Sequence, residues 1–292
     1  MNALADEAAA RAGGLWRDAL QRLRGSRAAI GAASALLLLI ALAILGPYLN
    51  PNRYDAIDWS CLAMPPGLLH AHWWGTDPLG RDLFVRTLLG TRISLAVGLL
   101  ATLVSLVVGI VYGAVAGYAG GSVDHLMMRV IEILSGLPLI FFVILLTVVF
   151  GRSEYLLFAA IGAIGWLTMA RIVRGQAMAI REREFVEAAA AAGAGPVRIL
   201  FRHVVPNVIG PVVVYAALTV PQIILFESFL SFLGLGIQEP QASLGTLIAS
   251  GATEMESAPW MLLIPSAVLA ILLISFHVLG DALRDALDVG EP

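Results

Sequence analysis

Stretches of about 20 nearly uncharged residues recur along this sequence, and they constrain its fold more than any other feature. A helix of that length crosses a hydrocarbon layer roughly 30 Å thick while satisfying its own backbone polar groups. Only 13% of the 292 residues are charged, against 59% that are hydrophobic, which is too few to surround one large water-soluble core. We therefore expect an all-α membrane protein.

Six segments have the length and composition of membrane spans. They are residues 28–45, 93–118, 128–150, 155–172, 208–229 and 260–279. The first follows five arginines between Arg11 and Arg27, so a cleaved signal peptide is an alternative reading of it. Its apolar run is longer than an ordinary signal-peptide core, and more membrane sequence follows Ala43. We therefore expect a first span here, and an even number of spans that returns both termini to one side.

The arginines predict which side that is, because inner loops of membrane proteins carry the excess of cations. All eighteen basic residues are arginine, and with the N-terminus inside, thirteen fall in inner segments and five in outer ones. Arg81, Arg86 and Arg92 are outer exceptions that can pair with Asp77 and Asp82. Both termini are therefore expected in the cytoplasm. The expected parts are a tail 1–27, a membrane domain 28–280 with outer segment 50–92 and inner loop 173–206, and a tail 281–292.

The inner segment 171–206, between the fourth and fifth expected spans, has the most informative pattern. It holds six arginines and three glutamates, so it is too polar to enter lipid. The pattern predicts a helix, a stop and a second helix that runs to about His203. Helix formers at 188–192 favour the first helix, Gly193 is a typical terminator, and Pro196 is a typical helix start. Short helices crossed against the ends of spans can transmit a push from a cytoplasmic partner. An ordinary solvated loop is the alternative, and spacing alone does not separate the two.

Four motifs carry a resemblance to a known family. Glu187-Ala188-Ala189 with Gly193 and, further on, Val205-Pro206 resembles the EAA loop of ABC-type importer permeases. Three more motifs resemble the second (C-type) membrane subunit of dipeptide, oligopeptide and nickel transporters. They are GTDPLGRD at 75–82, Glu227 followed by SFLSFLGLG at 228–236, and GDALRDALD at 280–288. Together they extend over nearly the whole chain, with Val85 and Val289 departing from the usual Ser and Pro at positions that do not bear on the loop.

The resemblance implies the type I importer permease fold, with six transmembrane helices and a cytoplasmic EAA loop between the fourth and fifth, in a bacterial inner membrane. It implies a homologous sister permease, two ATPase subunits that bind ATP and Mg²⁺, an extracytoplasmic substrate-binding protein, and no nucleic acid. The residues that it implies for ATPase coupling are Glu184, Glu187, Ala188, Ala189, Gly193, Pro196, Arg198, His203 and Pro206. Half of a peptide pathway working by alternating access is the expected function, with nickel or another small solute as the alternative cargo.

Independent observations agree with a subunit that needs partners. A Walker A loop requires a lysine to reach the nucleotide phosphates, and this sequence has no lysine. We therefore expect no enzyme activity and no cofactor in this chain, with ATP hydrolysis in partner subunits. No HExxH or GxSxG motif suggests an intramembrane enzyme. Two alternatives remain, a secondary transporter and a non-catalytic scaffold. A secondary transporter would show ionisable groups in the middle of its spans, or broken helices at matching positions in its two halves.

Several residues within the spans have candidate roles. Gly109, Gly113 and Gly117 are spaced by four, which lets another helix approach closely. Glu132, Gln222 and Glu227 are the pathway candidates. A charged side chain deep in lipid costs about 2.5–3.5 kcal/mol, so Glu132 is expected to face an inner vestibule or a basic group. Glu227 either contacts substrate near the outer end of its span or makes structural hydrogen bonds.

Metal ligands are sparse by sequence criteria. Cys61 is the single cysteine, which excludes an intrachain disulfide and any multi-cysteine site, and it is expected to be a passive thiol. His277 is alone in the last span and makes a poor metal site without a partner. No metal site is therefore expected. Pro138 and Pro221 interrupt their spans and are expected to kink them.

Overall fold

The computed structural model describes residues 20–67, 72–150 and 154–287, and within these ranges the chain is helical and has no strand. An isolated antiparallel bridge joins Thr76 and Asp82. The helices in chain order are α2 (Arg27–Leu49), α3 (Leu83–Ala119), α4 (Gly121–Ser135), α5 (Leu139–Phe150), α6 (Glu154–Arg181), α7 (Glu184–Ala191), α8 (Pro196–Ile199), a π-helical turn η1 (Leu200–Val204), α9 (Val205–Phe232), α10 (Leu244–Thr253) and α11 (Trp260–Leu287). The all-α expectation is confirmed.

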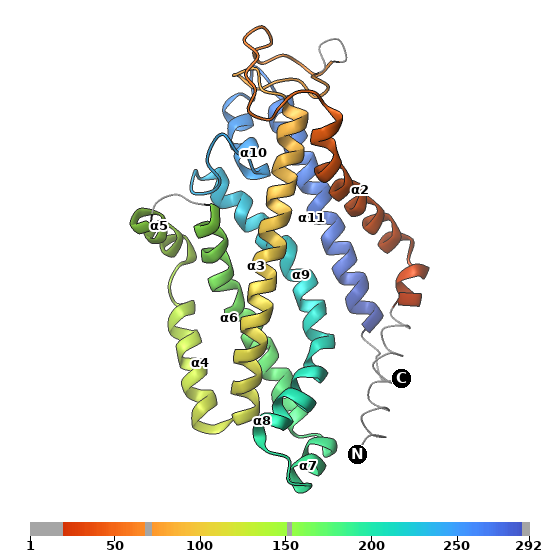
Figure 1. Ribbon diagram of the computed structural model, residues 1–292, viewed down its shortest axis with the longest axis vertical. Coiled ribbons are helices and arrows are strands. Elements are labelled where there is room, and N and C mark those ends of the chain that lie inside the picture. Colours follow the sequence, from red (N-terminus) through yellow and green to blue (C-terminus); the bar gives the residue numbers. More distant parts are fainter. Residues whose placement is uncertain (1–19, 68–71, 151–153, 288–292) are drawn as a thin grey trace.

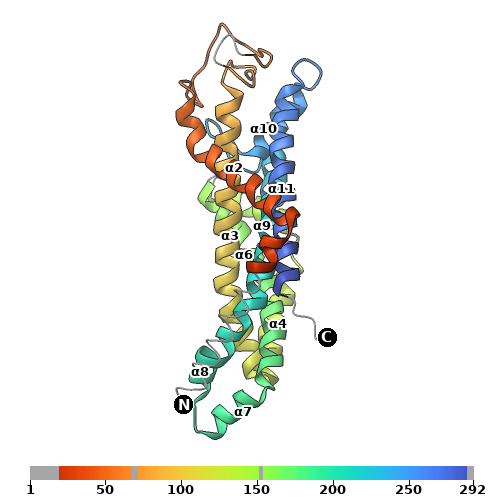
Figure 2. The ribbon, with the colours of Figure 1, turned by 90° about the vertical axis from the view of Figure 1, so that its right-hand side faces the viewer.

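The long helices run along the long axis of an elongated molecule (Figure 1). The short helices α7 and α8 lie at one end, which we call the coupling end. The segment between α2 and α3 and the short helix α10 lie toward the other, which we call the cap end. The view turned by 90° shows the same separation (Figure 2). The EAA-like motif at 187–193 and the GTDPLGRD motif at 75–82 therefore lie at opposite ends of the bundle.

Four helical runs in the described part of the chain are long and apolar enough to cross a membrane. They are α2, α3, α11 and the continuous run Pro196–Phe232. The pair α4 and α5 makes a fifth if it is counted as one broken span. The expected span 155–172 falls within α6, which is not among these runs. The count of six spans therefore stays a prediction.

Two expected spans differ in extent or shape from the helices in which they lie. Helix α3 begins at Leu83, ten residues before the expected start at 93, because the Asp82 carboxylate accepts the backbone N–H of Val85 and caps it. The kink expected at Pro138 is confirmed, because the expected span 128–150 falls on two helices, α4 and α5, that meet at an angle of 79°. Gly136 and Pro138 lie at the break, where proline has no N–H to continue the helix. Pro221, by contrast, lies inside the continuous helix α9.

Helices α3 and α6 approach each other closely along three glycines of α3. A Cβ atom added at Gly113 would lie 2.4 Å from the carbonyl oxygen of Ala170, and one at Gly117 would lie 2.5 Å from that of Arg174. At Gly109 the nearest atom would be Met169 Cγ, at 2.6 Å. These glycines therefore set the distance between the two helices.

Candidate functional site

Helix α7 has clear sequence-encoded ends. It begins after Arg183, and Glu184 and Glu187 lie in its first turn, where carboxylates favour the positive end of the helix dipole. It ends at Ala191, and Gly193 just beyond it has a φ of +83° that only glycine adopts readily. The N–H of Ala194 then donates to the carbonyl of Ala189 at 3.1 Å, closing a Schellman-type turn. The predicted stop at Gly193 is confirmed.

The second predicted helix does not end at His203. Helix α8 begins at Pro196, as predicted, but it passes through the π turn η1 directly into α9. Pro206 lies in the first turn of α9, where a missing N–H is tolerated, and the wider π turn shifts the hydrogen-bond register just before it. The inner loop is therefore mechanically continuous with the membrane helix α9.

The elbow formed by α7, α8 and η1 is anchored by buried residues and presents an exposed outer face. Val186 and Ile199 are buried in a cluster with Val173 of α6 and Val208 of α9. We call the exposed apolar side chains of this elbow, Phe185, Val197 and Phe201, together with its exposed polar groups, the coupling surface. Of the predicted coupling residues, Glu184, Glu187, Ala188, Gly193, Pro196, Arg198 and Pro206 are exposed, and Ala189 and His203 are half-buried.

The arginines of α6 are engaged with neighbouring helices. Both nitrogens of the Arg174 fork donate to the carboxylate of Asp124 on α4, the Nη2–Oδ2 pair at 2.5 Å. Arg171 donates to the Ser135 hydroxyl at 2.5 Å, and Arg181 donates to the carbonyl of Tyr118 at 3.4 Å. A bidentate arginine–carboxylate pair is one of the stronger polar contacts in proteins. These arginines therefore tie α6 to the end of α3 and to both ends of α4.

At the cap end, the GTDPLGRD motif folds into a closed turn around Asp77. The Oδ1 atom of Asp77 accepts the N–H groups of Leu79 and Arg81, each at 2.9 Å, and its Oδ2 accepts Arg81 Nε at 2.6 Å. Gly80 has a φ of +75°, and a Cβ atom there would overlap the carbonyl oxygen of Asp58. Asp77, Gly80 and Arg81 of the motif therefore form the turn.

This turn is also joined to the segment that precedes α10. Arg81 Nη2 donates to Glu239 Oε1 at 2.8 Å, and Arg86 Nη1 donates to the Pro240 carbonyl at 3.4 Å. Burial alone would lower the pKa of Arg81, but hydrogen bonds to Glu239 and Asp77 outweigh it and raise that pKa. The same contact lowers the pKa of Glu239. Residues far apart in sequence thus form one charged network at the cap.

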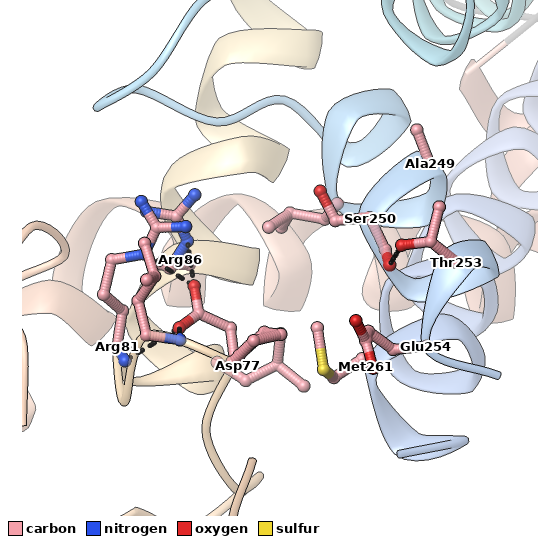
Figure 3. Close-up of a pocket in the computed structure, with 12 residues that line it drawn as sticks. Asp77, Arg81, Arg86, Ala249, Ser250, Thr253, Glu254 and Met261 are labelled. Atoms are coloured by element: carbon pink, nitrogen blue, oxygen red, sulfur yellow. Dashed lines mark hydrogen bonds and ion pairs between the residues drawn. The ribbon is translucent and has the colours of Figure 1, made fainter. Parts of the chain in front are cut away.

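A cavity of about 390 Å³ opens beside this network. Asp77, Arg81 and Arg86 lie on one side of it, and Ser250, Thr253, Glu254 and Met261 lie on the side formed by α10 and α11 (Figure 3). Its walls therefore carry both charges. The motif before α3 and the segment after α9 meet across it.

The pathway candidates lie in different environments. Glu227 is fully buried, and it accepts hydrogen bonds from Ser94 of α3 at 2.9 Å and Ser231 of α9 at 2.7 Å. The Ser94 hydroxyl in turn accepts the N–H of Leu244 at 3.4 Å, which adds the start of α10. Gln222 is exposed, and Glu132 pairs with Arg129 at 3.0 Å on the surface of α4. Within the single chain, the structure does not bring the three together.

Comparison with known proteins decides the family. Residues 109–290 match the family described as the binding-protein-dependent transport system inner membrane component. This chain belongs to that family. Residues 14–66 also match the N-terminal transmembrane domain of oligopeptide transport permease C. Both matches agree with the resemblance carried by the four motifs.

Curated relatives of this transport-component family cover almost the whole chain. The oligopeptide transport system permease protein OppC of Escherichia coli K12 is 52% identical over 94% of this chain and 91% of its own length. OppC of Haemophilus influenzae is 48% identical over 94% of this chain and 88% of its own length. The dipeptide transport system permease protein DppC of Bacillus subtilis is 43% identical over 93% of this chain and 85% of its own length.

Sequence reasoning missed three structural features of this transport component. It did not predict α10, although Ser243 and Thr246 form a capping box at its start. It treated Arg171 and Arg174 only as cations of a polar segment, since their helix partners are far away in sequence. It also did not place Glu239 beside Arg81, because no local spacing indicates a contact across 158 residues.

Proposed function

We propose that this chain is the membrane subunit that forms half of the translocation pathway of an ATP-driven oligopeptide importer. Six spans, cytoplasmic termini, a sister permease, two ATPase subunits and an extracytoplasmic binding protein belong to the proposal. The relatives named as oligopeptide and dipeptide permeases, at 43–52% identity over nearly the full chain, support peptides as cargo. Nickel and other small solutes are less well supported than peptides.

The observation that carries the proposal is the elbow at the coupling end. Its exposed apolar side chains, Phe185, Val197 and Phe201, suit docking to a partner protein. Its buried anchors, Val186 and Ile199, and the unbroken run from Pro196 to Phe232 link that surface to α9. A partner that moves α7 and α8 would therefore move α9. We assign this partner the role of the ATPase, in agreement with the absence of lysine and hence of a Walker A loop.

A matched pair of glycine substitutions tests the coupling role. Gly193 has a φ of +83° and Gly195 a φ of −68°, and a Cβ atom at either would meet nothing within 4 Å. Gly193→Leu therefore strains the backbone by about 1–2 kcal/mol, whereas Gly195→Leu does not require a left-handed conformation. We expect Gly193→Leu to abolish ATP-driven peptide uptake into proteoliposomes while the chain still inserts and assembles. Uptake that is equal in both variants would refute the coupling role of this turn.

A further inference from the structure

Three side chains of metal-ligand type converge at the cap end, away from the coupling surface. The Asp58 carboxylate, the Cys61 thiol and the His72 imidazole each bring one ligand atom to within 4.8 Å of the other two. Asp58 and Cys61 belong to one turn, in which the N–H of Cys61 donates to the carbonyl of Asp58 at 3.1 Å. His72 comes from the segment that leads to α3. Ligand atoms around one tetrahedral Zn²⁺ lie about 3–4 Å apart. Small side-chain adjustments would therefore bring these three atoms to Zn²⁺-binding distances.

The imidazole of His72 is already oriented as a ligand. Its Nδ1 lies 2.7 Å from Asp82 Oδ2 and 3.2 Å from Asn52 Nδ2, and in the tautomer that carries the proton on Nδ1 it donates to that carboxylate. The lone pair then lies on Nε2, which is 3.8 Å from Asp58 Oδ2. His72 is 95% buried, and its Nε2 has no hydrogen-bond partner among the described residues. A buried imidazole nitrogen that makes no hydrogen bond to the described residues and faces a carboxylate and a thiol points to a ligand between them.

The carboxylate of Asp58 is held in a matching way. Its Oδ1 accepts the N–H of Ser60 at 2.9 Å and the Ser60 hydroxyl at 2.5 Å. These two bonds hold the carboxylate in one orientation. They leave Oδ2 on the side of His72. Cys61 is buried, and it is the chain's one thiol.

We propose that Asp58, Cys61 and His72 bind one Zn²⁺ ion, with water in the fourth position. One nitrogen, one oxygen and one sulfur ligand suit Zn²⁺ and do not suit Mg²⁺ or Ca²⁺, which prefer oxygen ligands alone. Cys61 binds the ion as a thiolate, so its thiol proton is released to solvent when Zn²⁺ binds. The ion links the turn at 58–61 through His72 to Asp82, the cap of α3. It therefore ties the outer segment to a membrane helix.

The test uses the assembled complex in detergent, stripped of metal and then supplied with Zn²⁺ or Mg²⁺. We expect one Zn²⁺ per copy of this chain above the amount bound by Asp58→Asn and His72→Gln complexes, measured by competition with a chromogenic chelator. The peptide that contains Cys61 should react with maleimide at least tenfold more slowly in Zn²⁺ than in Mg²⁺, as read by mass spectrometry. His277→Gln and Asp55→Asn are controls that should keep both effects.

Asp58 is the most exposed of the three ligands, so Asp58→Asn keeps the test valid if His72→Gln does not assemble. Equal Zn²⁺ uptake by wild-type and Asp58→Asn complexes would overturn the proposal. So would a maleimide reaction of Cys61 that does not change with Zn²⁺. Neither readout depends on transport, so this proposal and the proposed function fail separately.

Discussion

Glu227 illustrates how a residue type alone leaves its role open. From sequence, a carboxylate in an apolar helix can belong to a pathway or to a structural network, and the structural role is the more common one. The structure surrounds it with the hydroxyls of Ser94, Ser228 and Ser231 and leaves none of it exposed. The hydrogen bonds around Glu227 therefore join α3, α9 and the start of α10.

We expect Glu227→Ala to destabilise the protein because it leaves the hydroxyls of Ser94 and Ser231 without their buried acceptor. Each buried hydroxyl without a partner costs about 1–3 kcal/mol. The measurement is thermal unfolding of the purified complex, with Gln222→Ala, exposed on the same helix, as control. Equal midpoints for the two variants would show that the network does not stabilise the fold.

The pair between Arg81 and Glu239 predicts a pH dependence. The hydrogen bond from Arg81 lowers the pKa of Glu239 below its ordinary value of 4.5, so the folded protein binds this proton more weakly than the unfolded chain. The pair therefore stabilises the fold above about pH 4.5, and its contribution is lost as pH falls through the lower folded value. Glu239 is largely exposed, so the contribution is at most about 1 kcal/mol.

Comparison of wild type with Glu239→Gln tests that dependence. Wild type should unfold at a slightly higher temperature at pH 7, and the difference should shrink as the pH falls below 4.5. Arg53 and Asp55 form an exposed pair at the same end, so Asp55→Asn shows how much an exposed pair contributes. A difference between wild type and Glu239→Gln that grows toward acid pH would contradict the assignment.

At the scale of helices, the glycines of α3 permit a prediction with an internal control. Replacement of glycine by alanine in a helix is favourable by about 0.5–1 kcal/mol where space allows. Gly175 of α6 has nothing within 4 Å of an added Cβ atom, whereas Gly113 faces the Ala170 carbonyl at 2.4 Å. We expect Gly175→Ala to leave stability unchanged or raise it, and Gly113→Ala to lower it by about 1–3 kcal/mol.

Thermal unfolding of the two alanine variants in the same detergent measures this difference. The sign of the difference is the decisive quantity, because both substitutions add the same atom to a helix. If Gly113→Ala proves as stable as Gly175→Ala, the contact between α3 and α6 is looser than described.

The helices that the sequence predicted best are those whose signals are local. Apolar runs located α2, α9 and α11, and Gly193 and Pro196 located the turn between α7 and α8. Errors arose where a local signal was overridden or read too simply. Asp82 starts α3 well before the uncharged run, and the π turn carries α8 past Pro206. The contacts of Arg81, Arg174 and His72 depend on distant residues, so no spacing could reveal them.

At the scale of the whole molecule, the two ends have different chemistry. The cap end concentrates the charged turn at Asp77, the cavity beside it and the Asp58, Cys61 and His72 cluster. The coupling end presents Phe185, Val197 and Phe201 to its surroundings. Helices α3 and α9 run between the two ends (Figure 1). This arrangement agrees with the proposed function, in which cargo enters at the cap end and the ATPase acts at the coupling end.

The most direct test of this account is a pull-down of the tagged chain in mild detergent, with measurement of ATPase activity and identification of the proteins that co-elute. We expect wild type to retain ATPase subunits and Glu187→Arg, on the coupling surface, to lose or uncouple them. Glu256→Arg, an exposed charge reversal at the cap end, should behave as wild type. A well-folded wild-type preparation without an ATPase, or full coupling in Glu187→Arg, would contradict the account.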